Sequence, residues 1–390
     1  MKKTAAALAA LGAMSGMAQA QSNVTLYGVL DMPIEFVAHQ AAGAPTVNQT
    51  TGAVTRQSGG NRVGLQGSGG LSGPRWGMRG VEDLGGGLQA IFVLESGFGV
   101  DTGNSQQGGR LFGRQALIGL RAGQYGTLTF GRQYTTMFDA FTNFVPMYFA
   151  PLYEPLAALA GVNFREDNMV KYVGVFGGLT AEAHYSFGAG TGTLGVVSLA
   201  GNGGGEVPGN FRDNSAYGGT LSYLSGPFGV VVGYDQWNPA VTIGNSASLK
   251  KASVAASYAM GPVKLVAGYR WGSNKDAAGN TLLRDDFYWV GANYQATGAL
   301  TLSLGYYYDN QKTMRVVPGS AAFNPENPWQ VSFLADYNLS KRTDVYLTMA
   351  YVKNSGLNFD TTATGFPNAY YLEQGHTSQV GVAMGIRHKF

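Results

Sequence analysis

The chain has 390 residues, of which 45% are hydrophobic and only 13% are charged, with 59 glycines and no cysteine. The absence of cysteine excludes a disulfide framework, a cysteine-ligated metal and a thiol nucleophile. Basic and acidic residues nearly balance, 26 against 23. This balance argues against a nucleic-acid-binding protein, because such proteins gather a basic surplus along one face.

Residues 1–20 have the pattern of a secretory signal peptide. A pair of lysines precedes the apolar run AAALAALGAM, and Ala18 and Ala20 offer the small residues of a cleavage site. A membrane anchor is the other interpretation, but a spanning helix needs roughly 20 strongly apolar residues and this run is short and mostly alanine. We therefore expect export, cleavage after Ala20 and one mature domain, a β-barrel over residues 21–390.

The mature part of the chain reads as a series of β-strands. Segments of about ten residues recur with apolar side chains at every second position. The last of them shows this most clearly, because one parity holds Val380, Val382, Met384, Ile386 and Phe390, whereas the other holds glycine, alanine, arginine and lysine. Charged side chains in the middle of the polar face favour a barrel with lipid outside and water inside over a soluble β-sandwich.

Short and long connections alternate between these segments. Seven short turns rich in glycine, proline or asparagine are expected at 82–87, 122–126, 176–178, 225–228, 260–262, 296–299 and 338–343. Eight long connections lie between them, including 40–60, 134–164, 188–214 and 354–375. This pattern predicts an all-β fold with sixteen antiparallel transmembrane strands and both termini on the short-turn side. The sheet must close, and the first strand must meet the last, because lipid offers no hydrogen-bond partner to a strand edge.

Several motifs carry a resemblance to a known family. They are VTLYGVLD at 24–31, PRWGMRGVEDLGGGLQAIFVLESGF at 74–98, RQALIGL at 114–120, YGTLTFGRQYT at 125–135, YNLSKRTDVYL at 337–347 and GVAMGIRHKF at 381–390. The chain resembles the general porins of Gram-negative outer membranes, in the branch of neisserial and other β-proteobacterial porins. These motifs run from the first strand to the last.

The resemblance implies a homotrimer of 16-stranded barrels. Each barrel would be a passive diffusion pore for small hydrophilic solutes and ions, anions included. It also implies contact with outer-membrane lipid and lipopolysaccharide, and a role for Phe390 as the signal read by the barrel-assembly machinery. The third long loop of similar porins folds inward and narrows the pore. Here that loop is 134–164, which is strongly apolar for a surface loop. A partner-binding or subunit-contact loop is the alternative, because exposed apolar patches usually mark an interface.

Cationic residues on the predicted strands are the candidates for lining the pore. Arg75 and Arg79 alternate with two apolar residues, so both should face the lumen, and Arg165 and Lys171 share one parity. Arg132 shares parity with apolar residues and is expected to anchor the root of the third loop. In similar porins an arginine cluster faces acids of the inward loop. The resulting candidates are a basic wall of Arg75, Arg114, Arg165, Arg79 and Lys171, and the loop acids Asp139 and Glu154.

A cluster of arginines predicts weak anion selectivity, because a passing anion relieves their mutual repulsion. The alternative for each arginine is a solvated ion pair that keeps the interior wet and rigid and contributes about 0–1 kcal/mol. Two other functions stay open at this stage. One is a substrate-specific channel of the same fold, and the other is a barrel-anchored adhesin.

Enzymatic functions find little support in the sequence. The four histidines are scattered and form no HExxH or paired metal motif, and no GxSxG nucleophile motif occurs. An outer-membrane hydrolase would have to use His184 or His376. We therefore expect no catalytic residue, no metal site, no cofactor and no nucleic-acid partner.

Overall fold

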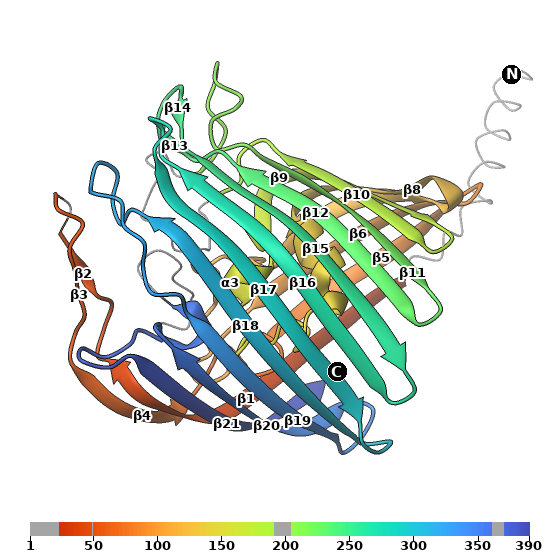
Figure 1. Cartoon of the computed structure of the whole chain (residues 1–390). Coiled ribbons are helices and arrows are strands. Elements are labelled where there is room, and N and C mark those ends of the chain that lie inside the picture. Colours follow the sequence, from red (N-terminus) through yellow and green to blue (C-terminus); the bar gives the residue numbers. More distant parts are fainter. Residues whose placement is uncertain (1–22, 49, 191–203, 361–369) are drawn as a thin grey trace, which may run out of the picture.

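The computed structural model describes residues 23–48, 50–190, 204–360 and 370–390. The expected signal peptide, residues 1–20, lies outside the described residues. The described chain forms one closed antiparallel β-barrel (Figure 1). None of its described helices is long and apolar enough to cross a membrane.

The barrel wall is built from strands that pair in chain order. They are β1 (Asn23–Ala41), β4 (Gly59–Leu65), β5 (Arg75–Gly85), β6 (Leu88–Gly97), β7 (Gln115–Ala122), β8 (Gly126–Tyr134), β9 (Arg165–Phe176), β10 (Leu179–Ser186), β11 (Ala216–Ser225), β12 (Phe228–Trp237), β15 (Ser248–Met260), β16 (Val263–Lys275), β17 (Thr281–Gln295), β18 (Leu300–Met314), β19 (Trp329–Asn338), β20 (Thr343–Lys353) and β21 (Ser378–Lys389). β4 and β5 pair with different parts of β1 and together fill one place in the wall. The predicted sixteen-stranded barrel is therefore confirmed.

The remaining elements lie in the connections. Two small hairpins project from long loops, one made by β2 (Thr46–Val47) and β3 (Val54–Thr55), the other by β13 (Ala240–Thr242) and β14 (Asn245–Ser246). The helical segments are η1 (Gly123–Tyr125), α2 (Thr136–Phe141), η2 (Thr142–Phe144), α3 (Leu156–Leu159) and η3 (Leu357–Phe359).

All seven predicted short turns connect strands where they were expected. Four of them, after β5, β9, β11 and β15, have only two residues between the strands. The first residue of each is a glycine with a left-handed backbone, with φ of 62° at Gly86 and Gly177 and 55° at Gly226 and Gly261. Tight hairpins require this conformation and glycine adopts it without steric cost, so these turns fix the pairing of their strands.

β1 and β21 close the barrel as the sequence predicted. They pair from Val29 opposite Lys389 to Val37 opposite Gly381. The pairing continues past the end of β21, because the backbone N–H of Phe390 donates to the carbonyl of Gly28 and the N–H of Gly28 donates back, both at 3.1 Å. No strand edge is left at the seam.

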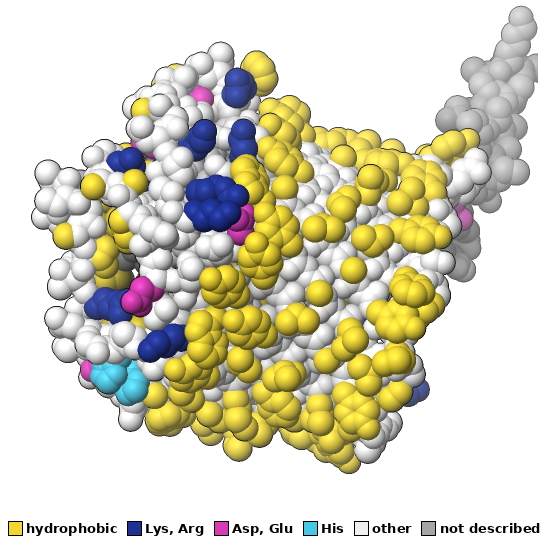
Figure 2. Space-filling model, viewed as in Figure 1, with side chains coloured by type: hydrophobic (Ala, Val, Ile, Leu, Met, Phe, Trp, Pro, Cys, Tyr) yellow, Lys and Arg dark blue, Asp and Glu magenta, His cyan; other side chains and the backbone are white. Residues whose placement is uncertain are grey.

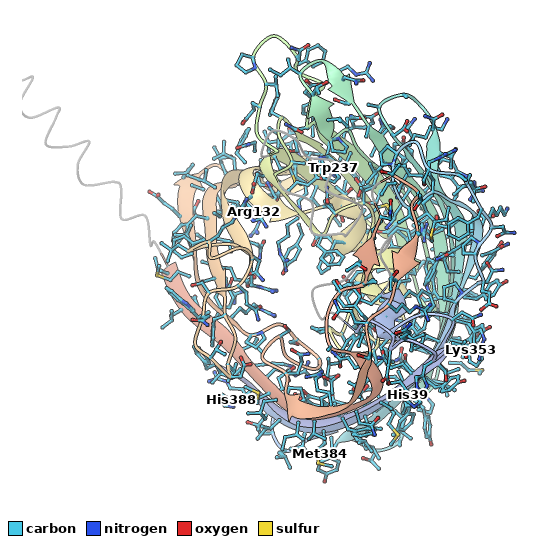
Figure 3. The ribbon with its side chains drawn as sticks, turned by 90° about the vertical axis from the view of Figure 1, so that its left-hand side faces the viewer. His39, Arg132, Trp237, Lys353, Met384 and His388 are labelled. Atoms are coloured by element: carbon cyan, nitrogen blue, oxygen red, sulfur yellow. The ribbon has the colours of Figure 1, made fainter. Side chains whose placement is uncertain are left out.

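The outer face of the wall is apolar. Met384 and Ile386 on β21 are 62% and 51% exposed, and Met384 projects from the outer rim of the barrel in Figure 3. Figure 2 shows hydrophobic side chains over the strands and charged side chains gathered at the end that carries the long loops. Inward positions hold polar residues such as Asp31, Glu95 and Gln379. The predicted alternation of lipid-facing and inward side chains is confirmed.

The third long loop, between β8 and β9, lies inside the barrel. In Figure 1 this yellow segment, which contains α3, lies within the ring of strands. Its side chains form the largest buried apolar cluster together with inward residues of the wall, among them Val231, Phe287, Trp289 and Val352. Polar groups on several strands of the wall bind the backbone of this loop. The indole N–H of Trp289 on β17 donates to the carbonyl of Phe144 at 2.8 Å. The side-chain amide of Gln330 on β19 donates to the carbonyl of Tyr153 at 2.9 Å. The inward fold explains the apolar composition of the loop, whose side chains are covered by the wall of its own barrel.

Candidate functional site

Three of the predicted basic residues gather beside the root of the third loop. Tyr134, the last residue of β8, accepts hydrogen bonds at its hydroxyl from Arg114 at 2.6 Å and from Arg165 at 2.8 Å. The guanidinium of Arg165 also lies over the Tyr134 ring, 4.3 Å from its centroid. The other face of that ring stacks on Phe138 of α2 at 4.5 Å. Tyr134 thus links the arginines of the wall to the inward loop.

A single carboxylate, Glu95 on β6, balances part of this charge. Arg114 donates to it at 2.8 Å, Arg75 forms an ion pair with it at 3.4 Å, and the hydroxyl of Tyr27 donates to it at 3.1 Å. Two guanidinium groups, those of Arg75 and Arg114, therefore pair with this carboxylate, and Arg165 joins the group through the hydroxyl of Tyr134. Three cations against one anion leave the charge of the group positive. The side chain of Arg75 is 25% exposed, so the positive charge reaches water.

The other two predicted cations lie at the edges of this group. Arg79 is exposed and lies over the ring of Tyr27, with 5.4 Å between its guanidinium carbon and the ring centroid. Lys171 donates to the backbone carbonyl of Tyr134 at 3.0 Å and to Asp139 of α2 at 2.6 Å. Asp139 keeps 38% of its side chain exposed. A loop acid and a wall lysine therefore meet within the interior.

Glu154 lies on the third loop as predicted, but its carboxylate does not face the basic wall. Its side chain is fully buried within the third loop. It accepts hydrogen bonds from the backbone N–H groups of Met147 at 2.9 Å and Phe149 at 2.6 Å, and from the hydroxyl of Tyr307 at 2.9 Å. Burial raises the pKa of the Glu154 carboxyl to about 7. A buried and partly protonated carboxyl contributes little charge to the pore. The role that fits Glu154 is to attach the third loop to β18 through Tyr307.

A β-bulge shapes the root of the loop on the β9 side. Two steps along β8, from Gly131 to Gln133, lie opposite three steps along β9, from Met169 to Glu166. Asn168 within this step has a left-handed backbone, with φ of 50°. The extra residue reverses the alternation of side chains along β9. Glu166 and Met169 are therefore both buried although their sequence parities differ.

Arg132 anchors the same region, in agreement with its predicted role at the loop root. It forms an ion pair with Asp167 at 2.7 Å and donates to the carbonyl of Gly113 at 2.7 Å. Asp167 also binds Arg110 of the second long connection at 2.7 Å. These contacts tie two neighbouring connections together beside the arginine group.

Two residues that organise the site were not predicted from the sequence. Tyr134 was expected only as the start of the loop, and Glu95 was not singled out. Glu95 lies within the FVLESGF motif, on the parity opposite to Leu94 and Phe92. An acid on the inward parity of a barrel strand was the available indication that the arginines would have a partner.

Comparisons with known proteins agree with this architecture. A family model described as Gram-negative porin matches residues 5–357. The chain is 32% identical to an outer membrane porin of Bordetella pertussis, with 100% of both chains covered. The anion-selective porin from Comamonas acidovorans superposes with a TM-score of 0.71 at 27% identity, over 95% of this chain and 100% of that one. The trimer form of OmpT from Vibrio cholerae, at 16% identity, has a TM-score of 0.62 over 95% and 99% of the two chains and shows the shared fold.

The closed antiparallel barrel is the fold that this chain shares with the solved porin structures. Members of the matched family are channels rather than enzymes. The predicted resemblance to the β-proteobacterial branch is confirmed. The chain therefore belongs to the Gram-negative porins and forms a diffusion channel in the outer membrane.

Proposed function

We propose that this porin is a general diffusion channel with a weak preference for anions, set by a basic wall of Arg75, Arg114, Arg165, Arg79 and Lys171. Asp139 is the loop acid opposite this wall. The observation that carries the proposal is the arginine group itself, in which Arg75 and Arg114 share the carboxylate of Glu95, and Arg114 and Arg165 share the hydroxyl of Tyr134.

The selectivity follows from the field of this group. Its surplus positive charge lowers the energy of an anion beside it and raises that of a cation. Asp139 is already paired with Lys171, so it cancels little of the remaining charge. The related Comamonas acidovorans protein is described as an anion-selective porin, which supports the same sign of selectivity here.

The chain works as a channel and not as an enzyme under this proposal. Diffusion requires no catalytic group and no cofactor, since a wet constriction selects by width and charge. The charged side chains of the arginine group are engaged with one another, and none of them is paired with a nucleophile in the described structure.

Recording single channels in a planar bilayer tests the proposal. With a salt gradient across the membrane, we expect linear, open conductance steps and a reversal potential of the sign for weak anion preference. Saturable block by a single solute would instead indicate a substrate-specific channel. Barrels that insert without conductance steps would favour the adhesin, and a strongly cationic reversal potential would contradict the basic wall.

We also infer that the exported chain begins at Gln21, after cleavage of residues 1–20, and assembles as a homotrimer surrounded by outer-membrane lipid and lipopolysaccharide. The trimer is supported by the OmpT fold, which was solved in a trimer form. Intact mass spectrometry of the protein from outer membranes should give a chain that starts at Gln21. Its native particle in detergent should have the mass of three chains, and a monomeric particle would contradict the assembly.

A further inference from the structure

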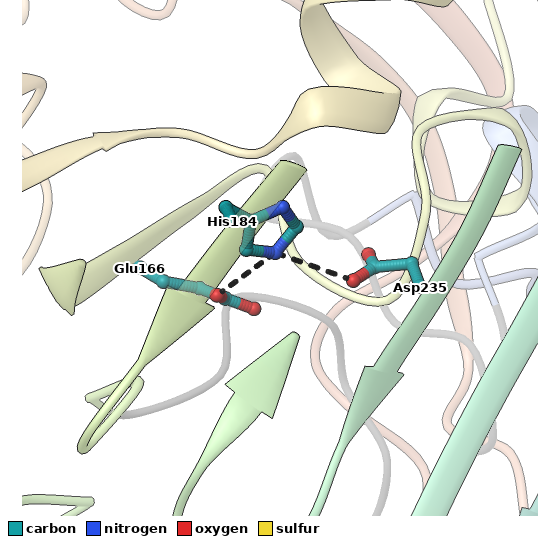
Figure 4. A group of neighbouring side chains, drawn as sticks. All are labelled: Glu166, His184 and Asp235. Carbon is teal, nitrogen blue, oxygen red and sulfur yellow. Dashed lines mark ion pairs between the residues drawn. The ribbon is translucent and has the colours of Figure 1, made fainter. Parts of the chain in front are cut away.

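Three buried side chains that play no part in the arginine group converge on one point (Figure 4). They are Glu166 at the start of β9, His184 on β10 and Asp235 on β12. Nε2 of His184 lies 3.4 Å from Oε2 of Glu166 and 3.7 Å from Oδ1 of Asp235, and all three side chains have no exposed area. The three atoms lie within 4.8 Å of one another.

The atoms that face this point lack hydrogen-bond partners. Oε2 of Glu166, Nε2 of His184 and Oδ1 of Asp235 are each buried without one. Leaving a buried polar atom unsatisfied is costly, and the cost is higher for a carboxylate. Three such atoms directed at the same point indicate that something binds between them.

The remaining polar atom of each side chain is held by the root of the third loop. Nδ1 of His184 lies 3.0 Å from the hydroxyl of Thr136. The other carboxylate oxygens accept hydrogen bonds, that of Glu166 from the amide of Asn163 at 3.1 Å and that of Asp235 from the N–H of Val162 at 2.8 Å. Outer contacts of this kind orient metal ligands and leave their coordinating atoms free.

The strand between the two wall ligands leaves room for them. His184 pairs across the sheet with Gly218 of β11, and Gly218 pairs with Asp235. A Cβ added at Gly218 would lie 2.7 Å from Cε1 of His184 and 3.1 Å from Oδ1 of Asp235. Any larger residue at this position would therefore push the imidazole and the carboxylate apart.

We propose that Glu166, His184 and Asp235 form a structural binding site for a divalent transition-metal ion, Zn²⁺ in particular. Zinc binds imidazole nitrogen and carboxylate oxygen at about 2.0–2.2 Å, so neighbouring ligand atoms of a tetrahedral site lie roughly 3.4 Å apart. The two distances from His184 match this spacing. Two carboxylates offset the charge of a dication, whereas Ca²⁺ would need six to eight oxygen ligands.

The position of the site gives the ion a mechanical role. Thr136 begins α2 directly after β8, and Val162 and Asn163 end the loop directly before β9. The ion would thus join both ends of the inward loop to β9, β10 and β12. This inference concerns the stability of the loop and does not depend on the selectivity of the channel.

Refolding the mature full-length chain in detergent tests the site, because a buried site is best loaded while the barrel forms. The chain is refolded with Zn²⁺ or with a chelator, dialysed, and its metal content measured together with its thermal unfolding midpoint. We expect about one zinc per chain and a higher midpoint for the zinc-loaded protein. Co²⁺ in place of zinc should give the visible absorption of a low-symmetry site.

Variants of His184 and Gly218 test whether the zinc binds at this site. His184→Gln should lower zinc content by about tenfold or more. Gly218→Ala, which keeps all three ligand residues but displaces His184 and Asp235, should weaken zinc binding by about tenfold. The control is the double variant His39→Ala and His376→Ala, which removes two stacked rings with a centroid distance of 3.8 Å at the loop end. This control should keep one zinc per chain.

Two outcomes would overturn the site. Wild-type chain that refolds normally and carries no zinc would show that a protonated His184 simply bridges the two carboxylates. Equal zinc content in the wild type and in a folded His184→Gln or Gly218→Ala variant would place the metal elsewhere.

Discussion

Replacing Arg75, Arg114 and Arg165 together with glutamine is expected to lower the anion-to-cation permeability ratio by roughly tenfold in dilute salt. A unit charge about 16 Å from a passing ion in a watery passage shifts the energies of an anion and a cation by roughly 0.25 kcal/mol each in opposite directions, so three such charges change their difference by about 1.5 kcal/mol. A difference of about 1.4 kcal/mol corresponds to a factor of ten. The measurement is the reversal potential in a salt gradient.

Two controls make this result specific. Lys341→Gln with Arg342→Gln removes two exposed cations from the short turn between β19 and β20, outside the arginine group, and should leave the reversal potential unchanged. Glu95→Gln removes the carboxylate shared by two of the arginines, so it should shift the potential in the opposite direction to the triple variant.

The salt dependence provides a further check. At about 1 M salt the Debye length falls to about 3 Å, so the effect of all these substitutions should shrink. If the triple variant keeps the selectivity of the wild type in dilute salt, the arginines act only as internal ion pairs that stiffen the wall.

The fold could be predicted because each of its determinants is local in sequence. Alternation along β21 sets which side chains face lipid, and the glycines at 177, 226 and 261 set where the chain reverses. Closure followed from the requirement that no strand edge face lipid. Apart from closure, which joins β1 to β21, none of these steps needed knowledge of which strands far apart in the chain would meet.

The site could be predicted only in part, because the direction of a loop side chain and the position of a β-bulge depend on contacts with distant parts of the chain. Glu154 can be placed on the inward loop from the sequence, but no sequence pattern indicates that its side chain turns into the loop and accepts a hydrogen bond from Tyr307. The extra residue near Asn168 reverses the alternation on β9. Parity alone therefore could not bring Glu166 to the side of His184. A search for metal motifs at close spacing could not find the proposed ligands, because they come from three separate strands.

The arginine assignments depended on family resemblance more than on alternation. Arg165 and Lys171 share a sequence parity, but the bulge lies between them. The structure brings them together through Tyr134, whose hydroxyl binds Arg165 and whose backbone carbonyl binds Lys171. The bridging role of Tyr134 can be recognised only in the folded structure, because it depends on where the third loop lies.

Deleting Phe390 is expected to reduce the amount of assembled barrel by about tenfold or more while leaving the conductance of assembled channels unchanged. The deletion removes two backbone hydrogen bonds to Gly28, each contributing about 1 kcal/mol. It also removes a ring that lies over Gly28 in the space a Cβ would occupy. The seam between β1 and β21 would then end one residue early, with unpaired backbone at the edge.

Conductance should not change because Phe390 lies on the outer face of the wall, where its side chain is 45% exposed, and not in the passage. The readouts are the heat-modifiable fraction in outer membranes and single-channel conductance of the purified barrels. Met384→Ala is the matched control, since it shortens another outward apolar side chain of β21 and keeps the terminus. An equal loss of assembly in this control would assign the effect to lipid-facing apolar area in general.

Gly28→Val changes the same seam on the β1 side. Its side chain would occupy the place of the Phe390 ring, and its Cβ would also lie 2.8 Å from the backbone carbonyl oxygen of Arg75, while both backbone hydrogen bonds to Phe390 remain possible. If the ring is what the assembly machinery reads, displacing it should impair assembly nearly as much as the deletion does. If backbone pairing is what matters, Gly28→Val should assemble well and the deletion alone should fail, so the pair of variants separates recognition of the terminal ring from closure of the seam.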